Sequence, residues 1–263
     1  MYRGYNLNLN WNPKCDDDFF EAGQELFLQY EETVKKTLKS YALKEGTLDG
    51  SKMQSNWFPQ VKADIFISHS HRDEKRAIAL AGWLYKVFGI KSFIDSCIWG
   101  YSNELLRLID NKYCFQESSR TYNYNSRNYS TSHVHMMLSV ALTMMIDQTE
   151  CIFFLNTPNS ISASSIIDKT ESPWIYSEIA MTQMIRKKKP RRHISGIEKL
   201  EKGGKLNESE LRIQYNIDLS HLVEIDINTL IDWKKDFTKS SSPNALDKLY
   251  ELTQDNDRNL ILG

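Results

Sequence analysis

Side chains able to do chemistry gather at two places in the sequence. Ser68-His69-Ser70 directly follows a short apolar run, 63–67, which has the residue types of a β-strand. Trp174 and Glu178 stand one helical turn apart in a helix whose start is marked by Ser172-Pro173. If both groups face one crevice, hydroxyls, an imidazole, an indole and a carboxylate would share a pocket. A carboxylate held in such a pocket can stabilise positive charge.

The elements that must position these groups follow a strand, helix, strand pattern. A strand at 63–67 leads into a helix at Glu74–Phe88, which Gly89 closes, and then into a second strand at 91–95. This βαβ unit implies a parallel sheet with a right-handed crossover. Three more strands are predicted at 151–155, 192–194 and 222–227. The fold class is therefore α/β: an open, parallel, five-stranded flavodoxin-like sheet with helices on both faces.

Ligands bind to such a sheet beyond the carboxyl ends of its strands. The loops expected there are 68–73, 95–101 and 156–173. The hydroxyls of Ser130–Ser132 are expected to cap a helix that runs to Ile146 and opens on the same edge.

The remaining segments are predicted to lie outside this core. Residues 1–60 are expected to form a helical extension, with a helix at Asp16–Ala42 and a linker at 46–59. Residues 61–263 form the main domain, which carries an irregular polar insertion at about 111–130.

Composition excludes several classes of protein. The 263 residues include 33 Lys and Arg against 34 Asp and Glu, so no global field attracts nucleic acid. The longest apolar run, 135–146, is too short to span a bilayer, and we expect no membrane association. The amino terminus lacks an export signal, and the four cysteines lack C-x-x-C spacing. A cytoplasmic location is therefore expected.

Three segments together resemble the Toll/interleukin-1 receptor (TIR) domain. They are the strand and turn Ala63-Asp64-Ile65-Phe66-Ile67-Ser68-His69-Ser70, the strand end Phe93-Ile94-Asp95, and the W-x-x-x-E helix Trp174-Ile175-Tyr176-Ser177-Glu178. The likeness covers roughly 61–227. Without receptor or death-fold modules, the chain most resembles bacterial TIR enzymes of Thoeris-type antiviral defence, which consume nicotinamide adenine dinucleotide (NAD).

The resemblance implies an NAD glycohydrolase or cyclase that breaks the bond between nicotinamide and ribose. Glu178 would be the catalytic glutamate, and Ser68, His69 and Ser70 would line the nicotinamide-ribose side. The products would be nicotinamide and a linear, cyclic or conjugated ADP-ribose that a separate effector protein could sense. NAD is the substrate, and no further cofactor is required. Self-association through TIR surfaces is the expected mode of activation.

By the same resemblance, residues 95–101 would form the mobile BB loop that closes over the substrate. Asp95, Trp99 and Tyr101 would contact substrate from this loop, and Trp99 offers a face on which a flat cationic ring can stack. Trp174 would line the pocket from the helix. We further hypothesise that Arg127, with the cap at Ser130–Ser132, binds the pyrophosphate.

The residues alone leave other interpretations open. Glu178 could be an exposed helix carboxylate paired with Arg186, Trp174 a core aromatic residue, and Asp95 a turn cap. The stripe Met136–Met145 is typical of a helix packed in a core. The histidines lack the partners of a metal site, so no metal is predicted. A non-catalytic TIR scaffold and an ADP-ribose sensor are the alternative functions.

Overall fold

The protein is built on a five-stranded parallel sheet. The computed structural model describes residues 1–9, 17–31, 41, 47–161, 169–188, 190, 215–240 and 244–254. The strands are ordered β3-β2-β6-β1-β9 and are all parallel. Their bounds are β1 Arg3–Asn8, β2 Ile65–Ser68, β3 Ser92–Ile94, β6 Cys151–Asn156 and β9 Val223–Asp226. The predicted α/β class and parallel sheet are confirmed.

The position of strand β1 differs from the expected domain organisation. It lies between β6 and β9, with Tyr5 paired to Phe153 on one side and to Val223 on the other. The other strands keep the flavodoxin-like order 2-1-3-5, and β1 occupies the fourth position. The first residues are therefore part of the central sheet, and the expectation that 1–60 form a helical extension outside it was wrong.

The βαβ unit matches its prediction closely. Helix α3, Glu74–Phe88, connects β2 to its parallel neighbour β3. It ends at Gly89, which has φ of 70° and caps the helix through backbone bonds to the carbonyls of Leu84 and Tyr85. A left-handed conformation at this position costs glycine least, so Gly89 fixes the end of the helix.

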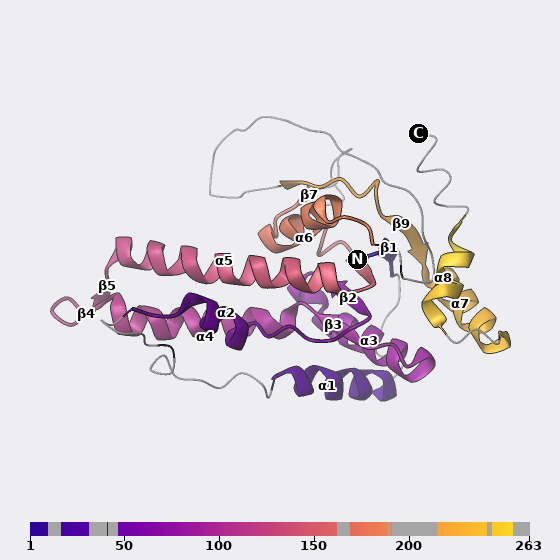
Figure 1. Cartoon of the computed structure of the whole chain (residues 1–263), viewed down its shortest axis with the longest axis horizontal. Helices are drawn as coiled ribbons and strands as arrows, with labels where there is room; N and C mark the ends of the chain where they lie inside the picture. Colours follow the sequence, from indigo (N-terminus) through magenta and orange to yellow (C-terminus); the bar gives the residue numbers. More distant parts are fainter. Residues whose placement is uncertain are drawn as a thin grey trace.

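Helices cover the two faces of the sheet in two groups. Helix α6, Pro173–Met184, packs on the face that carries Phe154, through Ile175 and Ile179. The opposite face carries Phe153, whose ring contacts Trp233 of α7, Ile227–Lys239. On this second face lie α3, α7 and α8, Ala245–Leu252, with α1, Asp17–Glu31, packed outside α3 (Figure 1).

Two long helices form an arm that extends from the sheet. Helices α4, Ser96–Tyr113, and α5, Tyr124–Gln148, lie side by side, and the β4–β5 hairpin, Phe115–Gln116 with Thr121–Tyr122, joins them at the outer end (Figure 1). The predicted irregular insertion at 111–130 was wrong, because these residues complete the two helices and the hairpin. Asn123, and not Ser130–Ser132, caps α5 by accepting a hydrogen bond from the backbone of Ser126.

The arm also replaces the expected BB loop. Residues 96–101 form the first turns of α4, directly after Asp95, so the expected loop at 95–101 is helical instead. No glycine occurs between Asp95 and Gly100, so no residue there requires a turn conformation. Helix α4 can therefore begin directly after Asp95. Residues 102–109 continue the same helix.

Helices α1 and α3 approach each other at two glycines. A Cβ added to Gly82 would overlap the carbonyl oxygen of Phe19, and one added to Gly23 would overlap that of Ile78. The backbones are therefore in direct contact, which larger residues would prevent. The linker predicted at 46–59 is also partly helical, because α2 spans Gly50–Trp57 with Asp49 as its N-cap.

Some predictions lie outside the described residues. These are the strand at 192–194 and the part of the first helix at 32–40. Among the described residues, no helix is both long enough and apolar enough to cross a membrane.

Candidate active site

The candidate site forms where β2 and β3 end beneath α6. Because Ile67 pairs with Ile94, the next residues along, Ser68 and Asp95, come to lie side by side. Ser68 also pairs with Phe154, which packs against α6, so its side chain is on the α6 face of the sheet. Helix α6 places Glu178 directly over this pair.

Two short contacts hold the site together. Ser68 Oγ donates a hydrogen bond of 2.6 Å to Glu178 Oε2. His69 Nδ1 lies 2.6 Å from Asp95 Oδ1. All four residues have 0% of their surface exposed. The structure therefore brings together four of the residues singled out in the sequence, and the interpretation of Glu178 as an exposed carboxylate paired with Arg186 was wrong.

Burial changes the charge states of these groups. It raises the pKa of Glu178 and of Asp95 well above their usual range, because a carboxylate loses its hydration there. The neighbouring carboxyl of Asp95 raises the pKa of Glu178 further, because two negative charges close together repel. Despite its carboxyl neighbours, burial lowers the pKa of His69 to about 4. The site thus combines a neutral imidazole with two carboxyl groups whose uncharged forms are favoured by burial.

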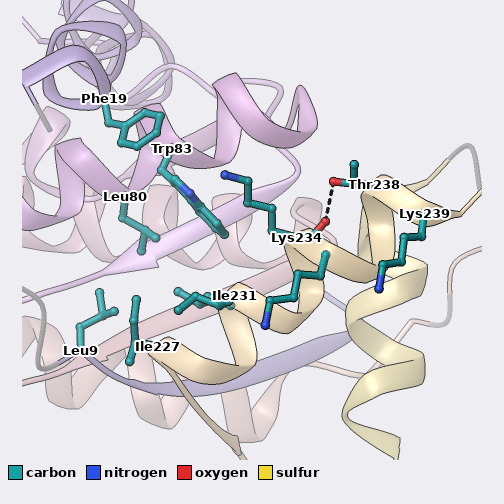
Figure 2. Close-up of a pocket in the computed structure, with 11 residues that line it drawn as sticks. Leu9, Phe19, Leu80, Trp83, Ile227, Ile231, Lys234, Thr238 and Lys239 are labelled. Atoms are coloured by element: carbon teal, nitrogen blue, oxygen red, sulfur yellow. Dashed lines mark hydrogen bonds between the residues drawn. The ribbon is translucent and has the colours of Figure 1, made fainter.

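A groove lies on the opposite side of the sheet from the candidate site. Figure 2 shows this groove of about 610 Å³, lined by Leu9, by Trp83 of α3 and by one side of α7. Leu9 follows Tyr5 and Leu7 on the face away from α6, so the groove is separated from Glu178 by the sheet. Its lining is mainly apolar, with lysines of α7 at the rim, and it offers none of the four site residues.

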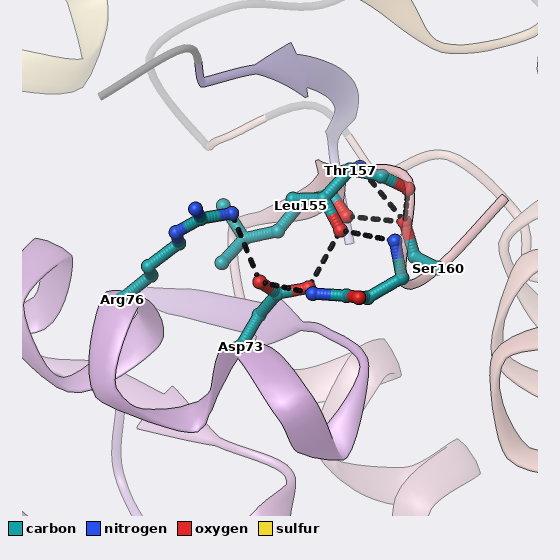
Figure 3. Close-up of polar contacts among 6 residues, drawn as sticks. Asp73, Arg76, Leu155, Thr157 and Ser160 are labelled. Carbon is teal, nitrogen blue, oxygen red and sulfur yellow. Dashed lines mark hydrogen bonds and ion pairs between the residues drawn. The ribbon is translucent and has the colours of Figure 1, made fainter. Parts of the chain in front are cut away.

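Next to the site, a polar network ties the loop after β2 to the loop after β6. Asp73, which is buried, accepts hydrogen bonds from Thr157 Oγ1 at 2.6 Å and from Asn159 Nδ2 at 3.0 Å (Figure 3). Arg76 adds an ion pair at 3.0 Å, and Ser160 Oγ donates to the carbonyl of Leu155. These contacts fix both loops at the point where the order of the strands reverses, the usual ligand crevice of such sheets.

The other predicted site residues are not part of the buried group. Ser70 is the N-cap of a short 3-10 helix, His71–Asp73, and is partly exposed. Tyr101 lies on α4 and packs partly buried against the main core. Trp174 makes an edge contact with the ring of His135, at 5.4 Å between centroids. The side chain of Trp99 lies outside the described residues.

Arg127 does not take the predicted pyrophosphate role. Its Nε donates to Asp110 Oδ2 at 2.9 Å, and its guanidinium lies 5.3 Å from the ring centre of Tyr122. Ser130 Oγ donates to the same carboxylate. Both groups therefore join α4 to α5 within the arm, and the hypothesis that they bind phosphate was wrong.

Sequence reasoning missed polar residues on β1 and at the end of β6. Asn8 pairs with Asn156 in the sheet, and both lie at the carboxyl edge. The signal was present, because residues 5–9 alternate as Tyr, Asn, Leu, Asn, Leu, which is the period of a strand with one apolar face.

Two further properties concern metal binding by the described residues and the similarity of the chain to known proteins. No group of three or more His, Cys, Asp or Glu side chains in the described ranges could hold a metal ion. Comparisons of the chain with family models, with curated proteins and with solved structures find no match.

Proposed function

We propose that the protein cleaves the bond between nicotinamide and ribose in NAD, with Glu178 as the catalytic carboxyl. The observation that carries the proposal is the contact between Glu178 and Ser68 at the carboxyl end of β2, beside the Asp95 carboxyl. This group lies at the sheet edge where α/β proteins bind nucleotides. The likeness of the segments around Ser68 and Glu178 to TIR enzymes points to the same chemistry.

The proposed reaction needs charge stabilisation more than proton transfer. When the C1′–N bond breaks, its electron pair passes to the ring nitrogen, and neutral nicotinamide leaves. The ribose becomes oxocarbenium-like, and a carboxylate close to it stabilises this charge in a site without water. Water or a hydroxyl or amine then bonds to C1′ and loses a proton. Ser68 is a positioning residue, since it holds one oxygen of Glu178.

The charge of the carboxyl pair matters for this step. A pair that has lost one proton carries a single negative charge shared between Asp95 and Glu178, next to an uncharged His69. A cationic substrate would favour this ionised form, because opposite charges attract strongly where water is excluded. The complete burial of the group means that a covering side chain must move to admit the substrate.

The test measures nicotinamide release from NAD by the purified protein, alone and with extract of phage-infected cells. Glu178→Gln should lower the rate by about 10²–10³-fold, the loss typical of removing one electrostatic stabiliser. Glu104→Gln, on the exposed face of α4, is the matched control and should release nicotinamide at the wild-type rate. Equal release by Glu178→Gln and wild type, or no release by the wild type in either condition, would contradict the proposal.

A second candidate function is assembly without catalysis, and the exposed side of α5 favours it. Met136 is 62% exposed, and Val140 and Met144, one and two turns on, are also exposed. The prediction that this Met-rich stripe belongs to the core was therefore wrong for these positions. A scaffold would tolerate Glu178→Gln and lose self-association on Met136→Glu. Self-association and a downstream effector also accompany the enzymatic proposal.

A further inference from the structure

Strand β1 brings a row of polar side chains to the carboxyl edge of the sheet. Asn8 pairs with Asn156 of β6 on one side and with Asp226 of β9 on the other. The three residues end their strands together, and all are at least partly exposed. The edge therefore presents two carboxamides and a carboxylate side by side.

This row is on the same face of the sheet as the candidate active site. Asn6 and Asn8 alternate with Tyr5 and Leu7, which face away from α6. Asn6 pairs with Phe154, and Phe154 pairs with Ser68 on its other side. Strands in a sheet are about 4.8 Å apart, so β1 lies about 10 Å from β2 and Ser68.

Asn6 supplies an independent sign that a ligand binds here. Its side chain is 3% exposed, yet Oδ1 has no hydrogen-bond partner among the described residues. An amide oxygen left unsatisfied in the interior is costly, so such groups are rare unless another molecule satisfies them. A hydroxyl donor entering from the neighbouring edge would meet this need.

We propose that Asn6, Asn8, Asn156 and Asp226 bind the adenosine-side ribose of NAD, and that they select its 2′-hydroxyl over a 2′-phosphate. This inference rests on the proposed function, because it assigns the second half of the same substrate. Carboxamides donate to and accept from hydroxyls, and a carboxylate accepts from them.

The charge on β9 decides between sugar and phosphate. Asp226 stands in the row itself, and Glu224 pairs with Asn6 one row earlier. Their negative charges would repel a 2′-phosphate, whereas an acidic residue next to a ribose hydroxyl is the arrangement that favours the unphosphorylated dinucleotide in other α/β proteins. Asp226 already accepts from Thr229 N at 2.9 Å as the N-cap of α7, which holds its carboxylate in place.

The test is calorimetric and needs no turnover. ADP-ribose should bind the wild type at least tenfold more tightly than ADP-ribose 2′-phosphate. Asn8→Ala should weaken ADP-ribose binding by about 3–10-fold, the effect of one lost hydrogen bond, and leave nicotinamide mononucleotide binding unchanged. Asn128→Ala, on the exposed face of α5, is the matched control and should bind as the wild type does.

The variant Asp226→Asn removes the negative charge at this position and keeps a side chain that can cap α7. Asparagine caps a helix as well as aspartate does, so α7 should remain intact while the discrimination against ADP-ribose 2′-phosphate falls. Equal binding of the two nucleotides by the wild type, no binding of ADP-ribose, or equal binding by Asn8→Ala and wild type would overturn the inference. Binding that depends on Asn8 in a protein that releases no nicotinamide would instead remove the proposed function and leave the ribose site standing.

Discussion

At the scale of single residues, burial determines what Asp95 and Glu178 can do. In water both groups would be carboxylates at neutral pH, and two like charges in contact would repel. Enclosed between β2, β3 and α6, both carboxyl groups have raised pKa values, so their uncharged forms are favoured and this repulsion is reduced. The same desolvation keeps His69 neutral. The buried group therefore favours the uncharged forms of all three side chains.

The raised pKa values make stability depend on pH. Asp95 has an ordinary pKa of 3.8, and burial raises it, so above about pH 4 the folded chain holds a proton that the unfolded chain has released. The free energy of unfolding contributed by this group therefore falls as the pH rises, by at most about 1.4 kcal/mol per pH unit. Asp95→Asn cannot ionise, so we expect it to gain stability relative to the wild type between pH 4.5 and 8.

Urea denaturation of both proteins at several pH values measures this difference. The lowered pKa of His69 acts with the opposite sign, adding stability as the pH rises from about 4 to 6.5, but His69 is present in both proteins and largely cancels. Asp236→Asn removes an exposed carboxylate from α7 and should give a difference that stays flat. A flat or opposite trend for Asp95→Asn would show that this carboxyl ionises normally in the folded protein.

At the scale of elements, the contact between α1 and α3 depends on the absence of side chains. Gly82→Ala would place a methyl group on the carbonyl oxygen of Phe19, and the two helices would have to separate. Overpacking of this kind costs about 1–3 kcal/mol or more, and we expect a loss of that size in the free energy of unfolding measured in urea.

The control for this prediction is another glycine in a helix. Gly100 lies in α4, and a Cβ built on it meets nothing within 4 Å. Gly100→Ala should stabilise the protein by about 0.5–1 kcal/mol, because alanine loses less backbone entropy in a helix. If both alanines had the same effect, the glycines of α1 and α3 would not be in contact.

Sequence patterns predicted best the helices whose ends are marked by residues typical of helix starts and caps. Helix α3 ends at Gly89 and α6 begins with Ser172-Pro173, as expected. Helix α5 was predicted to start too late, because Tyr124–Tyr129 has no apolar period, although its Arg127 contacts the neighbouring helix. Local propensity could not show this, since the partner, Asp110, belongs to another element.

At the scale of the whole molecule, the sequence predicted the meeting of Ser68 and Glu178 but not the position of Asn8 on the neighbouring strand. Ser68 and Glu178 follow recognisable strand and helix signals, so their meeting at one sheet edge was predictable. The position of Asn8 was not, because it depends on β1 inserting between β6 and β9, which come roughly 145 and 215 residues later in the chain. Short-range patterns mark β1 as a strand and say nothing of its neighbours.

The central position of β1 gives a prediction about the fold as a whole. Deleting residues 2–9 would remove the strand that pairs with both β6 and β9, and with it the buried contacts of Tyr5 with Phe153 and Thr253. The internal strand β6 would then expose unpaired backbone groups on one side, and the edge strand β9 would lose the one strand it pairs with in this sheet. We expect this variant to lose its cooperative thermal transition, followed by circular dichroism. Replacing the β4–β5 hairpin, 115–122, by a two-residue turn shortens the tip of the arm by a similar length and should preserve the transition, because the hairpin is exposed. A deletion of 2–9 that still melted cooperatively near the wild-type temperature would mean that β1 is an appendage to the sheet after all.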